Sequence, residues 1–345
     1  MTYPTFPKDC TSMLCKHLSP ELFETLKDKE TANGFTLEQV INSGLKNSDS
    51  EIGVYAGDED SYEVFAPLFD KVIEAYHGFS QSDKHHSNLN ADELKINGLD
   101  EGYILSTRIR VGRNVKDMPL GSAVSKEQRN EIEERVSSAL NALEGELEGE
   151  YYALLGMSKN VQERLIKEHF LFKDGDRFLE YAGLNRDWPH GRGIYHNHDK
   201  TFLVWLNEED QLRIISMQKG GDVLEVFSRL VLAMQKIEEK VPFAYSDRLG
   251  YISSCPTNLG TAMRASVHIK LPNLGENMEQ FKTITEKYFL QIRGVNGEHT
   301  KSEEGIFDIS NLRRLGITEV EAVQDMIDGV ASLIEAEKAL AEVVK

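Results

Sequence analysis

Two segments of the chain place basic side chains at every second position, which is the repeat of a β-strand. The alternating residues are Ser106, Arg108 and Arg110 in one segment, and Arg264, Ser266, His268 and Lys270 in the other. Because residues two apart in a strand share a face, each segment is expected to present a cationic face. Guanidinium groups offer a planar fork of donors that fits phosphate oxygens, so converging arginines can neutralise a polyphosphate. We therefore expect a triphosphate site.

The opposite faces of these two strands are expected to pack in the core. They consist of Leu105, Thr107 and Ile109 in the first strand, and of Ala265, Val267, Ile269 and Leu271 in the second. An antiparallel sheet with one face in water would show the same alternation, which is the alternative interpretation. The chain contains no GxxxxGK[ST] loop, no kinase glycine-rich loop over a strand, and no HRD or DFG signature. Phosphate binding would therefore rest on arginines.

Three acidic residues could supply the matching chemistry for a guanidinium group. Glu208, Glu209 and Asp210 lie between two apolar segments, 202–206 and 212–217, which are expected to pair as a hairpin with the acids at its tip. Carboxylates bind guanidinium groups in pairs of hydrogen bonds, and one of them can take a proton from a reacting nitrogen. Such a site would suit phosphorylation of a nitrogen atom. A solvated turn is the alternative interpretation.

One cysteine and one further acid stand in segments that could join this site. Cys255 precedes a turn before the second basic strand, where nearby arginines would favour its thiolate, although a buried cysteine is the alternative. Glu298 lies in a segment rich in glycine and charge, 293–305, which we interpret as a mobile active-site lid.

Length and composition indicate the type of fold that positions these residues. The chain has 345 residues, 40% hydrophobic and 28% charged, which predicts an ordinary globular protein with two unequal domains. Short helical patterns fill the first hundred residues, with helix starts expected at Ser19 and Thr36. A polar segment, 81–98, reads as a linker, so we place the boundary near residue 90. Beyond it we expect strands and two long amphipathic helices, 125–147 and 318–343, each opened by a capping box at Ser125 or Thr318.

Charge and cysteine content limit the partners. The net charge of −18 disfavours nucleic acid and anionic membranes, and no apolar run approaches the roughly 20 residues of a membrane helix. Three cysteines are too few and too scattered for a disulfide framework or a zinc site. With no visible secretory signal, we expect a cytoplasmic protein.

Four motifs now carry a resemblance that covers nearly the whole chain. STRIRVGR, FLVWLNEEDQLRIISMQKGG, CPTNLGTAMRASVHIKLPNL and RGVNGEHT resemble the phosphagen (guanidino) kinases, the group of arginine and creatine kinases. The resemblance implies an α+β fold, with a small all-α substrate-specificity domain (1–90) and a larger catalytic, nucleotide-binding domain (91–345) built on an antiparallel sheet flanked by helices. It also implies reversible transfer of the γ-phosphoryl group of MgATP to a guanidino nitrogen.

By similarity, five arginines hold the phosphates of ATP or ADP and the transferring group: Arg108, Arg110, Arg213, Arg264 and Arg293. The rest of the nucleotide site is implied to include Ser106, Thr107, Ile109, His169, Ala265, Ser266, Val267, His268, Gly294, Val295, Asn296, Gly297 and Glu298. Mg²⁺ is expected to be held by phosphates and water, with no protein ligand.

The resemblance also assigns the acceptor side of the site. Glu209 and Glu298 grip the guanidinium, Glu209 is the general base, Arg213 is catalytic, and Cys255 contacts the same group as a thiolate. A short loop reads the tail of the acceptor: Ser50, Glu51, Ile52, Gly53, Val54 and Tyr55. Asp49 and Arg177 resemble the pair that ties the two domains together in arginine kinases.

The short loop and Glu298 match arginine kinases, so L-arginine is the expected acceptor and energy buffering through phosphoarginine the expected role. Glu51 stands where arginine kinases typically have glycine, which leaves other guanidino acceptors open: taurocyamine, hypotaurocyamine, lombricine or creatine. A non-catalytic nucleotide-binding relative and a protein-arginine kinase are the remaining alternatives. By the same resemblance a monomer is expected, with a dimer as the alternative.

Overall fold

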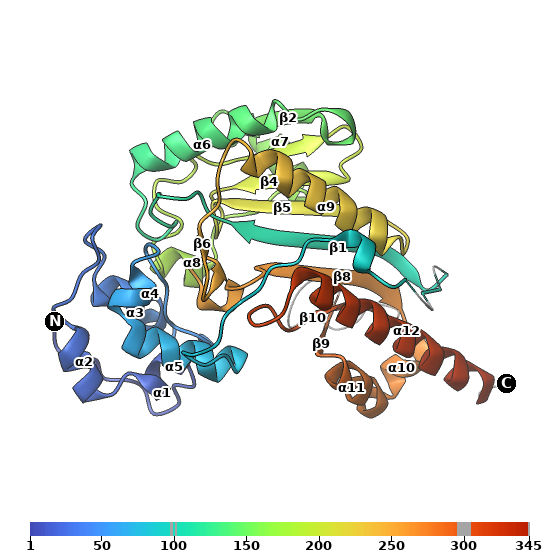
Figure 1. Ribbon diagram of the computed structural model, residues 1–345, viewed down its shortest axis with the longest axis horizontal. Helices are drawn as coiled ribbons and strands as arrows, with labels where there is room; N and C mark the ends of the chain where they lie inside the picture. Colours follow the sequence, from blue (N-terminus) through green and yellow to red (C-terminus); the bar gives the residue numbers. More distant parts are fainter. Residues whose placement is uncertain (97–98, 101, 295–304, 344–345) are drawn as a thin grey trace.

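The computed structural model describes residues 1–96, 99–100, 102–294 and 305–343, and is built around one large antiparallel sheet (Figure 1). The order of its eight strands is β2-β3-β4-β5-β1-β8-β10-β9, with every neighbouring pair antiparallel. In that order the strands are Gly149–Ala153, Gly193–Asn197, Phe202–Leu206, Leu212–Lys219, Ile104–Arg113, Met263–Lys270, Ile306–Asn311 and Leu290–Arg293. A separate two-stranded ribbon joins β6 (Tyr245–Ser246) to β7 (Gly250–Tyr251).

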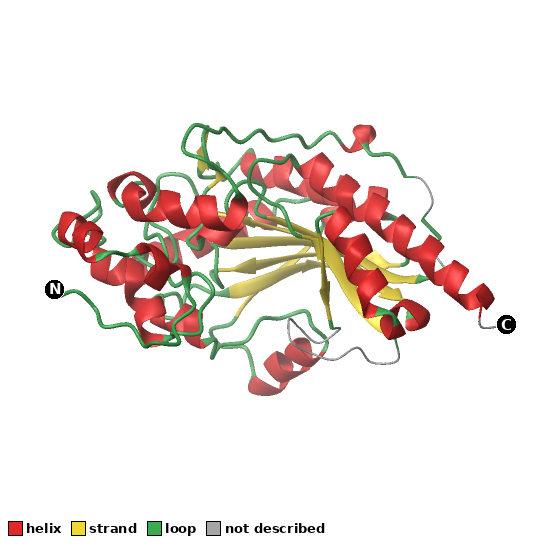
Figure 2. Cartoon of the chain, turned by 90° about the horizontal axis from the view of Figure 1, so that it is seen from below, coloured by secondary structure: helices red, strands yellow, loops and turns green. Residues whose placement is uncertain are grey.

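Short helices form the N-terminal part and gather at one end of the sheet, whereas the C-terminus lies at the other end (Figure 2). They are α1 (Met13–His17), α2 (Pro20–Leu26), α3 (Leu37–Lys46), α4 (Ser61–Val64) and α5 (Ala66–His77). The helix starts at Ser19 and Thr36 are as predicted: the Ser19 hydroxyl accepts from the backbone N–H of Leu22, and the Gln39 side chain accepts from that of Thr36. Each cap satisfies an N–H group that the first helical turn leaves unpaired.

The remaining helices pack against the sheet or around its edges. They are α6 (Lys126–Leu140), α7 (Lys159–Lys167), α8 (Arg177–Tyr181), α9 (Val223–Glu238), α10 (Pro272–Glu276), α11 (Met278–Lys287) and α12 (Glu319–Val343). Side chains of α6, α9 and α12 share one core with the apolar face of β1 and β8. The α+β architecture expected from the sequence is therefore confirmed. No helix among the described residues is long and apolar enough to cross a membrane.

The two largest apolar cores belong to different parts of the chain. The N-terminal helices form their own cluster around residues such as Phe23, Val40 and Phe69, and this cluster also takes in Leu249 and Leu315 from the sheet part. Residues 81–96 run between the two parts with only one short 3₁₀ turn, Ala91–Glu93. The segment is hydrogen-bonded to the C-terminal part on both sides of residue 90: the N–H of Asn88 donates to Glu319, and that of Lys95 donates to Gln324. The domain boundary near residue 90 therefore stays a prediction.

Two expectations on the elements need correction. The helix expected over 125–147 ends at Leu140, and only a 3₁₀ turn, Gly145–Leu147, follows; Gly145 has φ +66°, outside the helical region, so one continuous helix cannot pass through it. Leu105 is 45% exposed instead of facing the core, because the pairing of β1 with β8 shifts between Ile104 and Ser106. A bulge inserts one residue and thereby turns Leu105 outward. The hairpin of β4 and β5 and the capping boxes that open α6 and α12 are confirmed.

Candidate active site

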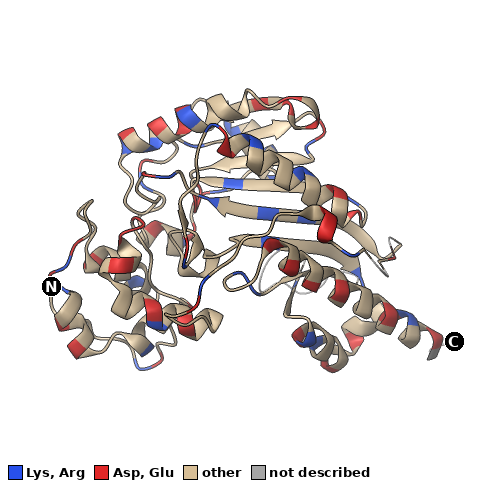
Figure 3. Ribbon diagram, in the orientation of Figure 1, with Lys and Arg blue, Asp and Glu red and all other residues tan. Residues whose placement is uncertain are grey.

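Arginines from three adjacent strands meet on the sheet face opposite the helical core. In Figure 3 the positions of Lys and Arg are blue bands on the ribbon of these central strands. Arg110 of β1 stands directly across from Arg264 of β8, and on the other side Gly112 of β1 stands across from Arg213 of β5. Like charges opposite each other destabilise a sheet unless another charge compensates them. The placement therefore favours an anionic ligand at this face.

A small cavity joins this cluster and adds an arginine that the sequence analysis missed. Arg110, Arg213, Arg264 and Arg314 line it together with Asp210. Arg314 follows β10 and is held by the carbonyl of Thr257 and the side chain of Asn258. Arg314 is not part of an alternating strand pattern in the sequence, so only the tertiary structure brings it to the site.

Arg108 and Arg110, both on β1, have no carboxylate partner among the described residues. Burial, reinforced by the neighbouring charges of Arg264 and Arg213, lowers the pKa of Arg108 to about 10, and burial likewise holds the pKa of Arg110 well below its usual value. Among the described residues, neither makes an ion pair with a carboxylate, and Nε of Arg110 is buried without a hydrogen-bond partner. A bound phosphate group would supply the missing negative charge.

The other arginines of the cluster are oriented by carboxylates. Arg213 lies 2.9 Å from a Glu208 oxygen and 3.1 Å from a Glu209 oxygen. Asp308 of β10 lies 2.9 Å from Arg264 and 3.6 Å from His268. The sequence analysis missed the roles of Glu208 and Asp308, although the alternation of Asp308 with Phe307 and Ile309 was an available signal. These ion pairs fix the direction of the guanidinium forks.

Asp210 at the β4–β5 tip is buried, and the side chains of Glu208 and Glu209 are only 16% and 17% exposed, which excludes a fully solvated turn. Burial raises the pKa of Glu209 to about 7, against the opposing influence of Arg213. Asp210 accepts hydrogen bonds from Asn114 at 2.8 Å and from Ser253 at 2.9 Å. Gly112 leaves the room for Asp210, because a Cβ at that position would lie 2.4 Å from the carboxylate. Glu209 is thus poised to gain or lose a proton near neutral pH.

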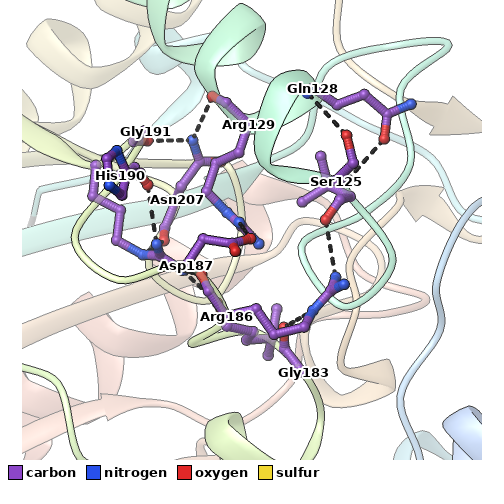
Figure 4. Close-up of polar contacts among 12 residues, drawn as sticks. Ser125, Gln128, Arg129, Gly183, Arg186, Asp187, His190, Gly191 and Asn207 are labelled. Carbon is purple, nitrogen blue, oxygen red and sulfur yellow. Dashed lines mark hydrogen bonds and ion pairs between the residues drawn. The ribbon is translucent and has the colours of Figure 1, made fainter.

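A polar network behind the tip holds its first residue, as the close-up in Figure 4 shows. Asn207 has φ +55°, and its side-chain amide donates to the carbonyl of Gly191 at 2.6 Å. The buried guanidinium of Arg192 donates to the carbonyl of Asn207 at 3.0 Å. Arg129 belongs to the same network, and its guanidinium pairs with Asp187 at 2.9 Å. The backbone that precedes Glu208 is therefore fixed by hydrogen bonds.

Tyr55, Cys255 and Glu209 converge from three distant parts of the chain. Tyr55 and Cys255 belong to one buried cluster, and the charge of Glu209 helps to raise the pKa of each. Burial is the main cause that raises the pKa of Cys255 to about 12. Burial and the charge of Glu209 both favour the neutral thiol, whose Sγ lies 3.2 Å from the hydroxyl of Thr257, and the thiolate expected on a bound guanidinium stays a prediction.

The loop 50–55 is built into the N-terminal helices and reaches the same cluster through Tyr55. Its carbonyls at Glu51 and Ile52 accept hydrogen bonds from the N–H groups of Met13 and Leu14. The Glu51 side chain is exposed. Gly53 has φ +80°, and a Cβ there would lie 2.9 Å from that of Leu14, so only glycine fits.

The ion pair between Asp49 and Arg177 is present. It joins the N-terminal part to α8, and Arg177 also donates to Asn47 at 3.0 Å. Both side chains of the pair are at least half exposed, so the contribution to the free energy of unfolding is small. Its geometry nevertheless fixes where the loop that follows Asp49 lies relative to α8.

The residues expected to line the nucleotide site divide into four groups. Ser106, Ser266 and His268 share the face of the arginines, whereas Lys270 at the strand end is exposed. The side chains that point into the opposite core, and can offer only backbone to a ligand, are those of Thr107, Ile109, Ala265 and Val267. His169 is exposed on a turn with φ +61°. Arg293 is across from Asp308 on β9, Gly294 follows it, and Val295, Asn296, Gly297 and Glu298 lie outside the described residues, as does most of the expected lid.

Comparison with known proteins decides the family. The model of the ATP:guanido phosphotransferase C-terminal catalytic domain matches residues 131–340, and the model of the N-terminal domain matches residues 8–74. The chain belongs to the ATP:guanido phosphotransferase family. It is accordingly a phosphotransferase that acts on a guanidino nitrogen and uses ATP or ADP, and the arginine cluster and its facing carboxylates are the features that fit this chemistry.

Several members of the ATP:guanido phosphotransferase family are similar over nearly the full chain. Arginine kinases of Penaeus vannamei and Homarus gammarus are each 55% identical over 333 residues, which cover 96% of this chain and 94% of each relative. The crystal structure of a lombricine kinase superposes with a TM-score of 0.93 at 40% identity, covering 98% of this chain and 95% of that one. A duplicated taurocyamine kinase from Schistosoma mansoni gives 0.88 at 44% identity, covering 94% of this chain and 46% of that one.

The hydrogen bonds of Asn207 can be tested separately from its positive φ. Replacing Asn207 by Gly keeps the backbone conformation but removes the side-chain donor, whereas Asn207→Ala removes the donor and adds left-handed strain. Because a buried carbonyl loses its partner in both, we expect losses of about 1–3 kcal/mol in the free energy of unfolding, larger for Ala than for Gly. Urea unfolding curves measure this. Equal stability of all three proteins would contradict the anchoring role.

The charge of Glu209 should control the reactivity of Cys255. Glu209→Gln removes a negative charge that raises the pKa of the thiol, so alkylation of Cys255 by iodoacetamide should speed up at a given pH. Peptide mapping by mass spectrometry measures the rate at this residue alone. The matched control is Glu163→Gln, an exposed position on α7. A rate that Glu209→Gln leaves unchanged would show that the two groups are not coupled.

Proposed function

We propose that this enzyme reversibly transfers the γ-phosphoryl group of MgATP to the guanidino nitrogen of L-arginine, which yields phosphoarginine and ADP and buffers cellular ATP in the cytoplasm. The identity of 55% to arginine kinases over 96% of the chain supports arginine as the acceptor. The observation that carries the chemistry is the pair of partly buried arginines, Arg108 and Arg110, which lack carboxylate partners among the described residues and lie beside the shielded carboxylates of the β4–β5 tip.

On the nucleotide side, the proposal assigns the phosphates and the transferring group to Arg108, Arg110, Arg213, Arg264 and Arg293, with Ser106, Ser266, His169 and His268 around them. Buried guanidinium groups need no reorganisation as charge develops on the transferring phosphoryl group, so they stabilise the transition state more than solvent does. When bound, Mg²⁺ neutralises charge on the phosphates. Among the described residues no three His, Cys, Asp or Glu side chains are grouped to bind a metal ion, so phosphates and water are its proposed ligands.

On the acceptor side, the proposal makes Glu209 the general base and Glu298 the second carboxylate on the guanidinium. Arg213, held between Glu208 and Glu209, aligns the carboxylate and faces the transferring group. The cationic guanidinium of the acceptor would lower the pKa of Cys255 by favouring the thiolate, so that the thiol becomes charged only when substrate is present. Tyr55 and the backbone amides of residues 50–53 are proposed to meet the acceptor's tail, and the exposed side chain of Glu51 remains in solvent.

We further propose the division of labour between residues 1–90, which select the acceptor, and 91–345, which bind the nucleotide and carry out transfer. The loop 50–55 belongs to the first part, whereas the arginine cluster belongs wholly to the second. A monomer would suffice for this chemistry, because all proposed residues come from one chain. The competing proposal is another guanidino acceptor, favoured by the TM-score of 0.93 with lombricine kinase.

The acceptor is tested by a coupled assay of ADP formation with L-arginine, lombricine, taurocyamine, hypotaurocyamine and creatine at equal concentrations. We expect kcat/KM to be highest for L-arginine. Glu51→Gly is the matched variant, and we expect it to change kcat/KM for L-arginine by less than about threefold, because an exposed side chain contributes little. Turnover with another acceptor but not with arginine would reject the assignment. ATP binding in calorimetry without any turnover would instead support a non-catalytic relative.

The base is tested by the pH dependence of phosphoarginine formation. Because the pKa of Glu209 is raised to about 7, its carboxylate is lost as the pH falls below that value, and kcat/KM should rise with pH to a plateau above about pH 8. Glu209→Gln should lower kcat by roughly 10²–10⁴ and abolish this rise. Glu208→Gln, which leaves the base in place, should retain the rise. A pH profile of Glu209→Gln identical to that of the original enzyme would remove the assignment.

A further inference from the structure

A second cavity, of about 580 Å³, lies away from the arginine cluster. It is formed by residues 152–157 at the end of β2, by one side of α7, and by His196 and Lys200 around the β3–β4 turn. None of its lining residues belongs to the arginine and carboxylate groups described above. We name it the α7 cavity. Its volume is in the range that binds small organic molecules.

Most of the lining is apolar or aromatic. Leu155, Met157, Val161 and Leu165 supply aliphatic surface, and the side chain of Leu155 is 56% exposed. The rings of Tyr152 and His196 stack at 5.2 Å with an angle of 21° between their planes, so they form a flat wall. An exposed leucine beside a flat aromatic wall favours a ligand with a planar apolar body.

The charge of the lining differs from that of the whole chain. The net charge is −18, yet Arg164 and Lys200 line the α7 cavity and no carboxylate does so among the described residues. Arg164 makes no ion pair or side-chain hydrogen bond with any described residue. Lys200 is 3.6 Å from Glu168 and 4.6 Å above the ring of Phe170, and Glu150 is engaged by the hydroxyl of Tyr152. The cavity therefore offers unmatched positive charge.

A smaller cavity between α6 and α9 provides the contrast. It measures about 310 Å³, and its two lysines, Lys236 and Lys240, are accompanied by Glu144 and Glu239. Lys236 and Glu239 are 3.0 Å apart. Positive and negative charges are balanced in this smaller cavity, so an anion would gain little electrostatic attraction there. In the α7 cavity an anion would be attracted by the charge of Arg164, which no described carboxylate pairs with.

We propose that the α7 cavity is a binding site for a small aromatic anion, with a flat apolar body and one carboxylate, sulfonate or phosphate group. The body would pack on Leu155, Met157 and the ring of Tyr152, and the anionic group would lie between Arg164 and Lys200. The proposal needs no turnover and does not depend on which guanidino compound is the acceptor.

The test is a fluorescence titration of the full chain with 8-anilinonaphthalene-1-sulfonate. Both tryptophans, Trp188 and Trp205, pack in the same apolar cluster as Val161 and Met157, so energy transfer from tryptophan reports binding at this place. We expect saturation at one probe per chain. Arg164→Ala and Lys200→Ala should each raise the dissociation constant about tenfold, and Lys167→Ala, an exposed residue of the same helix outside the lining, should leave it unchanged.

Two further arms separate charge from apolar surface. The neutral probe N-phenyl-1-naphthylamine should bind at least tenfold more weakly than the sulfonate, and the alkyl anion decanoate should also be weaker because it cannot stack. Leu155→Asp, a change at an exposed position, should abolish binding of the sulfonate with an unchanged urea midpoint. Equal affinity of the neutral probe, tighter binding of decanoate, or unchanged affinity in Arg164→Ala and Lys200→Ala would each overturn the proposal.

Discussion

The site depends on positive charge that the fold buries on one sheet face and does not neutralise in full. Arg110 and Arg264 stand directly across neighbouring strands, where their repulsion opposes folding. Asp308 offsets the charge of Arg264, and Glu208 and Glu209 offset that of Arg213, but no described carboxylate pairs with Arg108 or Arg110. The positive charge that remains can attract phosphate groups. The large apolar core on the other face of the sheet offsets the unfavourable free energy of this charge.

The environment of the β4–β5 tip determines the pKa values of the acids that face this positive charge. Water is largely excluded from Glu208, Glu209 and Asp210, so ionisation of Glu209 is resisted by burial and favoured by Arg213, and the balance leaves its pKa near neutrality. The same exclusion raises the pKa of the Cys255 thiol. Both groups would thus change charge in response to a bound guanidinium. The network of Asn207, Arg192 and Gly191 prevents the tip from relaxing into solvent.

The proposed acceptor loop and the arginine cluster lie in different halves of the molecule. The loop 50–55 is fastened to α1 through backbone hydrogen bonds, and Asp49 and Arg177 hold its start against α8. Tyr55 then lies beside Cys255 and Glu209, across the division between the two cores.

The sequence alone predicted the strand faces, the β4–β5 hairpin, the helix caps and the family, because alternation, turn residues and caps act over a few neighbouring positions. Local pattern could not show that Leu105 turns outward at a bulge. Nor could it show that the tip acids are shielded from water, that burial raises the pKa of Cys255, or that Arg314 and Asp308 lie beside the arginine cluster. Those outcomes follow from desolvation and from charges contributed by segments far apart in the chain, so only the tertiary structure decides them.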